Sequence, residues 1–186
     1  MANKIRLADP LENDSIVNGE GLRMVVWTQG CLHNCLECHN PKTHSMTGGF
    51  LKDIDELKQE ILQYKYCDGL TLSGGDPFFQ IDESLEIAKF CKDNSINVWA
   101  YTGFTYEQLI TIAKTNPNIL ELLKNIDVLI DGKFILEQKS LDIKFCGSRN
   151  QRIINVASSL KKGKAVLVKK YLPKKINNKD EEHLFI

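Results

Sequence analysis

Short apolar runs rich in β-branched and aromatic residues alternate along the chain with longer stretches of helical periodicity. The runs predict strands at 24–29, 69–73, 97–102, 127–132, 152–156 and 165–171. Apolar residues recur at helical spacing in DIDELKQEILQYK, DESLEIAKFCKDN and the shorter TYEQLITIAK. Since strands that alternate with helices build a parallel sheet covered by those helices, the pattern predicts an α/β fold with a mostly parallel sheet.

The pattern continues without a break that would divide the chain, and we predict a single domain over residues 1–186. A domain of this length buries roughly 70% of the surface that its unfolded chain exposes, which is enough for a substantial core. The segment 161–186 is rich in lysine, with eight lysines and no acidic residue between positions 161 and 179. We expect a solvated surface there, with a docking surface for a protein partner or electron donor as the alternative.

The overall charge of the chain is balanced, with 24 basic and 24 acidic residues. This balance gives no reason to expect nucleic acid, a membrane surface or a strongly acidic partner. No apolar run is long enough to cross a bilayer, and no apolar segment follows a basic start, so we expect a soluble cytoplasmic protein. Cytosolic thiols stay reduced, and the six cysteines therefore indicate a metal or redox centre plus core thiols, not a disulfide framework.

Three of the cysteines lie close together in TQGCLHNCLECHNP. Soft thiolates select zinc, copper(I) or iron–sulfur clusters, and three protein ligands leave one coordination position open. A [4Fe-4S] cluster on Cys31, Cys35 and Cys38 would use that position to bind a chelating substrate. A zinc site completed by His33 or His39 is the main alternative, and a redox pair of Cys35 and Cys38 is a further one. The spacing alone leaves the choice between cluster and zinc open.

Further candidate residues follow the predicted strands, at the ends where parallel sheets carry their active residues. In LSGGDP, Gly74 and Gly75 let backbone groups approach a ligand closely, and Asp76 suits a ligand ammonium group. Asp76 before a proline is also a good helix N-cap, which is the structural alternative. In LIDGK, Asp131 could accept hydrogen bonds from a ribose and Lys133 could pair with a carboxylate, unless both are solvated loop charges. The scattered cysteines are expected to be inert small side chains: Cys67, Cys91 and Cys146.

The order of these motifs resembles that of radical S-adenosylmethionine enzymes, in which a tripled cysteine and a glycine-glycine-acid turn follow successive strands. Within that superfamily the chain is similar to the activating proteins of anaerobic (class III) ribonucleotide reductase. The similarity runs from about residue 18 to residue 156, through NGEGLR, TQGCLHNCLECHNP, LSGGDP, YTGFTYE, DVLIDGKF and FCGSRNQRIINV. The pyruvate formate-lyase activating enzymes are the nearest competitor, since CHNP is equally typical of them, whereas DGKF followed by GSRNQR favours the reductase activators.

The resemblance implies a partial (incomplete) TIM-like β/α barrel of the radical S-adenosylmethionine type, built on the mostly parallel sheet. It implies that a [4Fe-4S] cluster is held by three catalytic cysteines: Cys31, Cys35 and Cys38. It also implies a set of S-adenosylmethionine contacts: His39, Asn40, Gly74, Gly75, Asp76, Thr102, Asp131 and Lys133. In this set the SGGD turn would receive the ammonium group, the aspartate of LIDGK the ribose, and the lysine of LIDGK the carboxylate.

The implied activity is that of an oxidoreductase that installs a glycyl radical on another protein. The reduced cluster would cleave S-adenosylmethionine to methionine and a 5′-deoxyadenosyl radical. That radical would remove a hydrogen from a backbone glycine of the large subunit of anaerobic ribonucleotide reductase. The glycine loop of this subunit and a flavodoxin-like electron donor are the implied partners, and a partial barrel would leave an open side for the loop.

Two residues depart from the superfamily pattern. Asp76 stands where glutamate is commoner, and Glu37 stands where many members carry an aromatic residue before the third cysteine. Two other functions remain compatible with the residues: a radical S-adenosylmethionine enzyme with a small-molecule substrate, and a zinc-binding interaction module. Formation of 5′-deoxyadenosine without a protein substrate would indicate the first, and a colourless bound metal would indicate the second.

Overall fold

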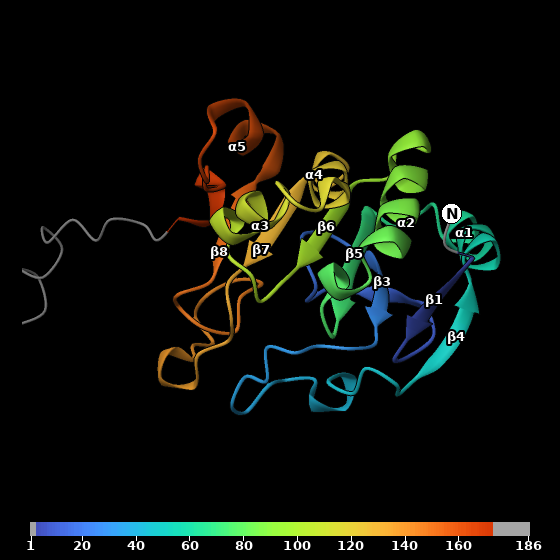
Figure 1. Ribbon diagram of the computed structural model, residues 1–186, viewed down its shortest axis with the longest axis horizontal. Coiled ribbons are helices and arrows are strands. Elements are labelled where there is room, and N and C mark those ends of the chain that lie inside the picture. The colour runs from blue at the N-terminus through green and yellow to red at the C-terminus, as the bar shows by residue number, and fades with distance from the viewer. Residues whose placement is uncertain (1–2, 173–186) are drawn as a thin grey trace, which may run out of the picture.

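The computed structural model describes residues 3–172, which form one eight-stranded sheet with helices packed on it (Figure 1). The predicted lysine-rich segment 161–186 therefore lies partly outside the described residues. The strands follow one another across the sheet in this order: β4 (Phe50–Asp53), β1 (Lys4–Leu7), β3 (Arg23–Thr28), β5 (Gly69–Gly74), β6 (Val98–Tyr101), β7 (Val128–Asp131) and β8 (Arg152–Asn155). Strand β2 (Glu12–Ser15) pairs with β3 beside this path.

The four central strands β3, β5, β6 and β7 run parallel to one another. The outer strands β1, β2, β4 and β8 pair antiparallel with their neighbours. Residues Arg23–Thr28 of β3 pair in register with Gly69–Gly74 of β5, so the carboxyl ends of these two strands lie side by side. The sheet formed by residues 3–172 is open, with β4 and β8 at its two ends. The predicted α/β fold with a parallel central sheet is confirmed, and the antiparallel margins are a feature that the pattern did not indicate.

Three helices coincide with the stretches of helical periodicity: α1 (Ile54–Gln63), α2 (Ile81–Asp93) and α3 (Tyr106–Ile112). The side chain of Asp53 accepts hydrogen bonds from the first backbone amides of α1. Thr105 and Gln108 form a reciprocal capping box at the start of α3. The apolar residues of these helices pack on the central strands, which explains why their periodicity was visible in the sequence.

Two further helices, α4 (Pro117–Lys124) and α5 (Val156–Lys162), are missing from the prediction. Helix α4 follows α3 within the same connection between β6 and β7, where the prediction placed a single helix, and α5 begins at the last residue of the predicted strand 152–156. Each nevertheless begins at an asparagine side chain that accepts a backbone hydrogen bond, Asn116 for α4 and Asn155 for α5. Within residues 3–172 no helix combines the length and the apolar character needed to cross a membrane.

The predicted strand at 165–171 is wrong. The segment makes one isolated bridge to β8 and then forms a 3₁₀ turn at Lys169–Tyr171. The ring of Tyr171 packs against the rings of Trp99 and Phe145, with centroid distances of 6.2 and 5.5 Å. Docking of this aromatic side chain turns the backbone away from the sheet, so tertiary packing overrides the strand propensity of AVLVKKY.

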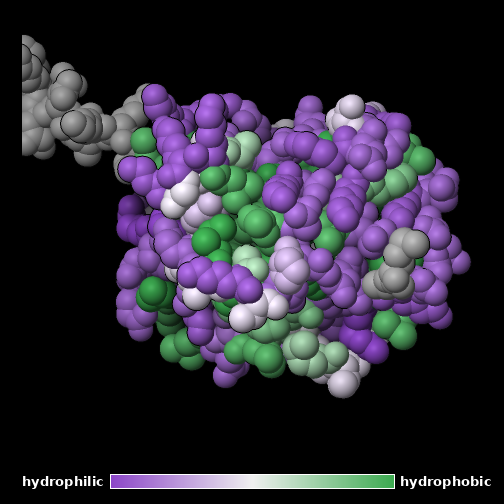
Figure 2. Space-filling view, turned by 45° about the horizontal axis from the view of Figure 1, so that its top comes forward, coloured by the Kyte–Doolittle hydropathy of each residue, from purple (hydrophilic) through white to green (hydrophobic). Residues whose placement is uncertain are grey.

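The main core lies between the sheet and its helices. Val26 on β3 and Leu72 on β5 are fully buried there, and residues at the alternate positions of these strands point to the opposite face. A separate apolar cluster on the opposite face contains Trp99, Ile130 and Ile153. On the side turned to the viewer in Figure 2, hydrophilic side chains predominate and apolar ones gather in smaller patches between them. The helices thus bury one face of the sheet and leave the other available to form a site.

Candidate active site

A cavity of about 550 Å³ lies at the carboxyl edge of the parallel strands. The loops that follow β3, β5, β6 and β7 all contribute to its wall: Cys31, Cys35, Cys38, Gly74, Gly75, Thr102, Gly103, Gly132 and Phe134. In Figure 1 the loop after β3 and the loop between β7 and β8 lie at the same edge of the sheet. Parallel strands end at a common edge, which is why turns far apart in the sequence meet here.

The cysteine loop, residues 29–49, is closed where it leaves β3. The amide of Cys31 donates a hydrogen bond to the carbonyl oxygen of His44 at 3.1 Å. Gly30 has a φ of +105°, and a β-carbon at this position would approach Sδ of Met46 to 2.9 Å. Glycine suits both the left-handed backbone and the close contact. The loop is therefore anchored beside the end of β3, with its three cysteines on the cavity wall.

A backbone amide contacts one of the three sulfur atoms of the loop. The amide of Asn40 donates a hydrogen bond to Sγ of Cys38 at 3.4 Å. Burial raises the pKa of the Cys31 thiol to about 11, and burial also raises the pKa of Cys35. A bound metal removes such thiol protons, and N–H donors then stabilise the negative sulfur and tune the reduction potential of a cluster.

The three thiols fit an iron–sulfur cluster with three protein ligands. All three are free and share one cavity wall, and the sulfur of Cys38 has a backbone N–H donor. Within the part of the chain that the structure describes, no three His, Cys, Asp or Glu side chains lie close enough to hold a single metal ion. A four-iron cluster is a much larger body than an ion, and its ligands surround a correspondingly wider space.

Asp76 is a buried hydrogen-bonding centre, with 1% of its surface exposed. Its Oδ2 accepts hydrogen bonds from the hydroxyl of Thr102 at 2.8 Å and the amide of Gly103 at 2.9 Å, and lies 2.8 Å from Nε2 of His33. Its Oδ1 accepts a hydrogen bond from the amide of Phe78 at 2.9 Å, so Asp76 caps the following 3₁₀ turn. The structure thus gives Asp76 the N-cap role, and the carboxylate is absent from the lining of the cavity.

His33 is fixed by aromatic packing as well as by this carboxylate. Its ring packs against Phe79 and Phe104, with centroid distances of 5.4 and 4.5 Å. A zinc site that used Nε2 of His33 would have to break the contact with the buried carboxylate. His39, the other imidazole of the motif, lines the cavity and packs against Phe134 at 4.8 Å.

The SGGD turn packs directly against the base of the cysteine loop. A β-carbon at Gly75 would lie 2.4 Å from the carbonyl oxygen of Gly30, and one at Gly74 would lie 2.4 Å from that of Thr28. Gly74 also has a φ of +100°. Both glycines line the cavity, and the missing side chains let β3 and β5 meet closely at its floor.

The other predicted contacts divide into two groups. Asn40 and Thr102 line the cavity together with His39, although the hydroxyl of Thr102 is committed to the buried carboxylate. Lys133 is exposed and lies outside the lining, with its Nζ 3.4 Å from the carbonyl oxygen of His33. The predicted contact of this lysine with a ligand carboxylate therefore requires its side chain to move.

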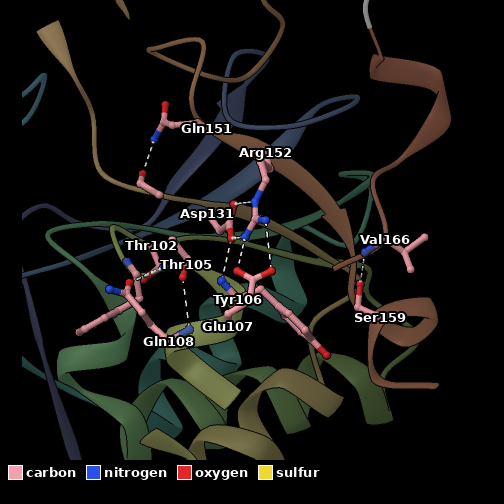
Figure 3. Close-up of polar contacts among 12 residues, drawn as sticks. Thr102, Thr105, Tyr106, Glu107, Gln108, Asp131, Gln151, Arg152, Ser159 and Val166 are labelled. Atoms are coloured by element: carbon pink, nitrogen blue, oxygen red, sulfur yellow. Dashed lines mark hydrogen bonds and ion pairs between the residues drawn. The ribbon is translucent and has the colours of Figure 1, made fainter. Parts of the chain in front are cut away.

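Asp131 is 1% exposed and pairs with Arg152 (Figure 3). Nε and Nη2 of Arg152 donate to its two oxygens at 2.9 and 2.5 Å, and the amide of Tyr106 donates to Oδ2 at 2.7 Å. Arg152 also pairs with Glu107, and the two carboxylates raise the pKa of the guanidinium. These contacts join β7 and β8 to the start of α3. Asp131 is absent from the cavity lining, so the predicted ribose contact would compete with this network.

We expect Asp131→Asn to lower the free energy of unfolding by about 2 kcal/mol, because it removes the closest negative charge from the partly buried Arg152 guanidinium. Denaturation in urea would measure the loss. Glu107→Gln is the matched control, since the Glu107 side chain is 57% exposed and should contribute less than about 1 kcal/mol. Equal losses in the two variants would contradict the central position of Asp131 in the network.

Several lining residues escaped the prediction: Trp27, Ser73, Tyr101, Cys146 and Gln151. Trp27 and Ser73 are register partners at the carboxyl ends of β3 and β5. Side chains alternate between the two faces of a strand, so residues next to core positions point to the other face of the sheet. This two-residue alternation could have identified Trp27 and Ser73 as cavity residues. Cys146 and Gln151 lie between β7 and β8 outside regular structure, where no periodicity marks a residue.

Comparison with known proteins places this site in a family. A family model described as "4Fe-4S single cluster domain" matches residues 17–154. The anaerobic ribonucleoside-triphosphate reductase-activating protein of Haemophilus influenzae is 36% identical over 151 residues, covering 74% of this chain and 90% of that protein. The protein of the same name from Enterobacteria phage T4 is 35% identical over 145 residues, covering 74% and 86%. The pyruvate formate-lyase-activating enzyme of Clostridium pasteurianum is 36% identical over 123 residues, covering 63% and 52%.

The family match spans the cysteine loop and the turns around the cavity. Fold, site and relatives together define an iron–sulfur enzyme of the radical S-adenosylmethionine class. The chain belongs to the family of anaerobic ribonucleoside-triphosphate reductase-activating proteins. The resemblance drawn from the order of the motifs is thereby confirmed, as are the predicted [4Fe-4S] cluster and S-adenosylmethionine.

Proposed function

We propose that this protein installs a glycyl radical on the large subunit of anaerobic ribonucleotide reductase. The observation that carries the proposal is the presence of three free cysteines on one cavity, within the residues that match the family. The names of the similar proteins state that they activate anaerobic ribonucleoside-triphosphate reductase, and we extend that target to this chain. When bound, the reduced cluster and S-adenosylmethionine supply the 5′-deoxyadenosyl radical, while the protein supplies binding and orientation.

Three thiolates of the cysteine loop would hold the cluster: Cys31, Cys35 and Cys38. Gly74 and Gly75 would offer backbone groups to the ammonium of S-adenosylmethionine. Asp76 would support this contact indirectly, because its carboxylate holds the loop after β6 in place by a hydrogen bond. We also propose that S-adenosylmethionine contacts three residues that line the cavity: His39, Asn40 and Thr102. The proposed contacts of Asp131 with the ribose and of Lys133 with the carboxylate need a rearrangement of both side chains.

The target glycine loop would enter from the open side of the cavity. Val17 and Leu141 belong to the lining and are 69% and 94% exposed, so they offer apolar contacts to an incoming polypeptide. Trp27 and Phe134 give apolar walls that would exclude water from the reacting atoms. We infer that the open sheet is the partial TIM-like β/α barrel of this enzyme class and that residues 1–186 act as one domain. The parallel centre with its site at the carboxyl edge supports this inference.

A flavodoxin-like protein is the proposed electron donor. Exposed lysines at the end of the described chain could attract an acidic donor: Lys161, Lys162, Lys164, Lys169 and Lys170. We place the reaction in the cytoplasm, where thiols stay reduced and available to bind iron. The balanced charge of the chain gives no reason to add nucleic acid or a membrane as a partner.

Pyruvate formate-lyase is the second candidate target. The observation in its favour is the similarity of pyruvate formate-lyase-activating enzymes to this chain at 34% to 36% identity. The chain, however, covers only 52% and 61% of those two enzymes, against 90% and 86% of the two reductase activators. The shorter architecture of the reductase activators therefore matches this chain better.

The decisive experiment incubates the reduced, iron-loaded protein with S-adenosylmethionine and either the purified large reductase subunit or pyruvate formate-lyase, under anaerobic conditions. We expect a glycyl radical in the EPR spectrum of the reductase, together with 5′-deoxyadenosine in equal amount. A radical only on pyruvate formate-lyase would indicate the second candidate. Deoxyadenosine formed without a radical on either protein would indicate a small-molecule substrate, and bound zinc without iron would indicate an interaction module.

A further inference from the structure

His33 lies between the first two cysteines of the motif, and its side chain is only 7% exposed. The other residues of the stretch 32–37, apart from the second cysteine, are exposed: Leu32, Asn34, Leu36 and Glu37. Among these neighbours, His33 is therefore the side chain by which the stretch enters the interior of the protein. It lines the cavity together with the three cysteines.

The imidazole of His33 joins the cysteine loop to the ends of two other strands. Its Nε2 lies 2.8 Å from Oδ2 of Asp76, which follows β5. The same oxygen accepts hydrogen bonds from the Thr102 hydroxyl and the Gly103 amide, which follow β6. Since a carboxylate oxygen accepts, Nε2 of the ring carries the proton and donates it. One buried carboxylate thus holds the middle of the cysteine loop and the loop after β6 together.

The ring also fits closely against the surface that receives it. It packs against Phe79 and Phe104, with centroid distances of 5.4 and 4.5 Å. A β-carbon at Gly103 would lie 2.3 Å from Cδ2 of His33, far closer than van der Waals contact allows. Glycine at position 103 therefore makes room for the ring. His33 is held by shape as well as by a hydrogen bond.

The backbone between the cysteines needs an anchor of this kind. Asn34 and Glu37 have φ values of +50° and +54°, in the left-handed region that few residues other than glycine adopt. Within the part of the chain that the structure describes, no amide of residues 32–37 donates to another backbone group. An unfavourable backbone conformation persists only where the surroundings fix it. The side chain of His33 supplies contacts that the backbone of this stretch lacks.

We propose that His33 is a positioning residue for the iron–sulfur cluster, because its buried ring fixes the backbone between Cys31 and Cys35. The inference rests on the proposed function, since it requires a cluster held by the cysteine loop. Removal of a group that orients metal ligands typically weakens metal binding by about tenfold to a hundredfold. In this role His33 binds no iron itself, since its Nε2 is committed to the carboxylate.

The same contact ties the cysteine loop to the turn at which S-adenosylmethionine would bind. The amide of Asp76 donates to the carbonyl oxygen of Gly30 at 3.0 Å, and its side chain holds His33. Asp76 directly follows Gly75, which is a proposed contact of the ammonium group. The base and the middle of the cysteine loop are thus fixed to one residue beside that contact. Displacement of His33 should therefore weaken both iron retention and S-adenosylmethionine binding.

Two variants at position 33 test the contact without measuring activity. The full chain is loaded anaerobically with iron and sulfide, and the release of iron to a chelator is followed. We expect His33→Ala to release iron about tenfold faster than the wild type. Its reduced EPR signal should respond to S-adenosylmethionine only at a higher concentration. His33→Gln keeps an N–H donor and should restore most of the retention. Wild-type release from His33→Ala, or equally fast release from both variants, would overturn the proposal.

Ser159→Ala is the matched control for a general loss of stability. The buried hydroxyl of Ser159 donates to the carbonyl oxygen of Asn155 at 2.7 Å and accepts from the amide of Val166 at 2.8 Å, outside the cavity lining (Figure 3). This variant should unfold at a lower urea concentration but release iron at the wild-type rate. Release as fast as that from His33→Ala would show that any destabilisation loosens the cluster, and would contradict a specific role of His33.

Gly103→Ala tests the same contact from outside the cysteine loop. Its methyl group would displace the His33 ring, so we expect iron to be released about tenfold faster than from the wild type. In the His33→Ala background the ring is gone, and Gly103→Ala should add little. Residues that act through one contact are not additive. Independent, additive effects in the double variant would overturn the proposal.

The metal-free full chain separates this proposal from the proposed function. Glu37 is exposed within the stretch that His33 anchors. Cleavage after Glu37 by a glutamate-specific protease should be about tenfold faster in His33→Ala than in the wild type, because the loop opens more easily. Equal cleavage would overturn the role of His33 whether or not a cluster forms. Failure of the wild type to assemble four irons would instead contradict the proposed function.

Discussion

Replacement of Cys31, Cys35 or Cys38 by alanine, one at a time, should abolish assembly of the four-iron cluster. The three thiols are the sulfur ligands that the cysteine loop brings to the cavity, and two remaining ligands would leave half of the irons without a sulfur from this loop. Iron and sulfide analysis of anaerobically reconstituted protein would measure the loss, and EPR after reduction would confirm it. Glycyl radical formation on the reductase should disappear together with the cluster.

The matched control for these variants is Cys67→Ser. Sγ of Cys67 donates to the carbonyl oxygen of Asn13 at 3.2 Å, away from the cavity lining, and serine keeps a donor at this position. This variant should contain the same iron and sulfide per chain as the wild type. Normal cluster content in any of the three alanine variants would contradict the ligand assignment, because the loop would then lack one of its proposed ligands.

Asp76→Ala should cause the largest loss of stability among the substitutions at the cavity. It leaves the hydroxyl of Thr102, the amides of Gly103 and Phe78, and the His33 ring without their common acceptor in a buried site. Unsatisfied buried donors are costly, and we expect the free energy of unfolding to fall by about 4 kcal/mol. Urea denaturation of the metal-free protein would measure this loss apart from any effect on the cluster.

Two comparisons make the Asp76 result specific. Asp76→Asn keeps the shape and one acceptor oxygen, so it should lose about half as much stability as the alanine variant. Thr105→Ala removes an exposed helix cap and should cost only about 1 kcal/mol. A loss at Asp76 no larger than that at Thr105 would show that the buried carboxylate does not hold the loops together.

The sequence was most informative where one local rule acted on many consecutive residues. Helices α1 to α3 were predictable because burial of one face imposes a regular period. The central strands were predictable because burial on both faces leaves short continuous apolar runs. Helices α4 and α5 were missed because α4 shares one connection with α3 and α5 directly continues β8. The segment 165–171 was misread because Tyr171 docks against Trp99 and Phe145. The sequence AVLVKKY does not indicate which aromatic rings its tyrosine will pack against in the folded chain.

The hydrogen-bond partners of Asp76 and Asp131 could not be predicted from the sequence. Both are acidic residues at the carboxyl ends of parallel strands, where a ligand contact is a reasonable expectation. In the structure both are buried and satisfied by protein donors, Asp76 by two loops and a ring, and Asp131 by Arg152 and α3. Whether a carboxylate faces a ligand or a protein donor depends on the neighbours that folding brings to it.

The sequence by itself determined that a thiolate metal centre is present, because three cysteines within eight positions can meet through local spacing alone. The order of the motifs then indicated the cluster through the family resemblance. The sequence also determined the α/β architecture, because periodicity records which face of each element is buried. Only the tertiary structure decided which side chains share the cavity, including Cys146, which lies more than a hundred positions after Cys38. Such contacts arise from the packing of whole elements, and the spacing of residues along the chain carries no record of them.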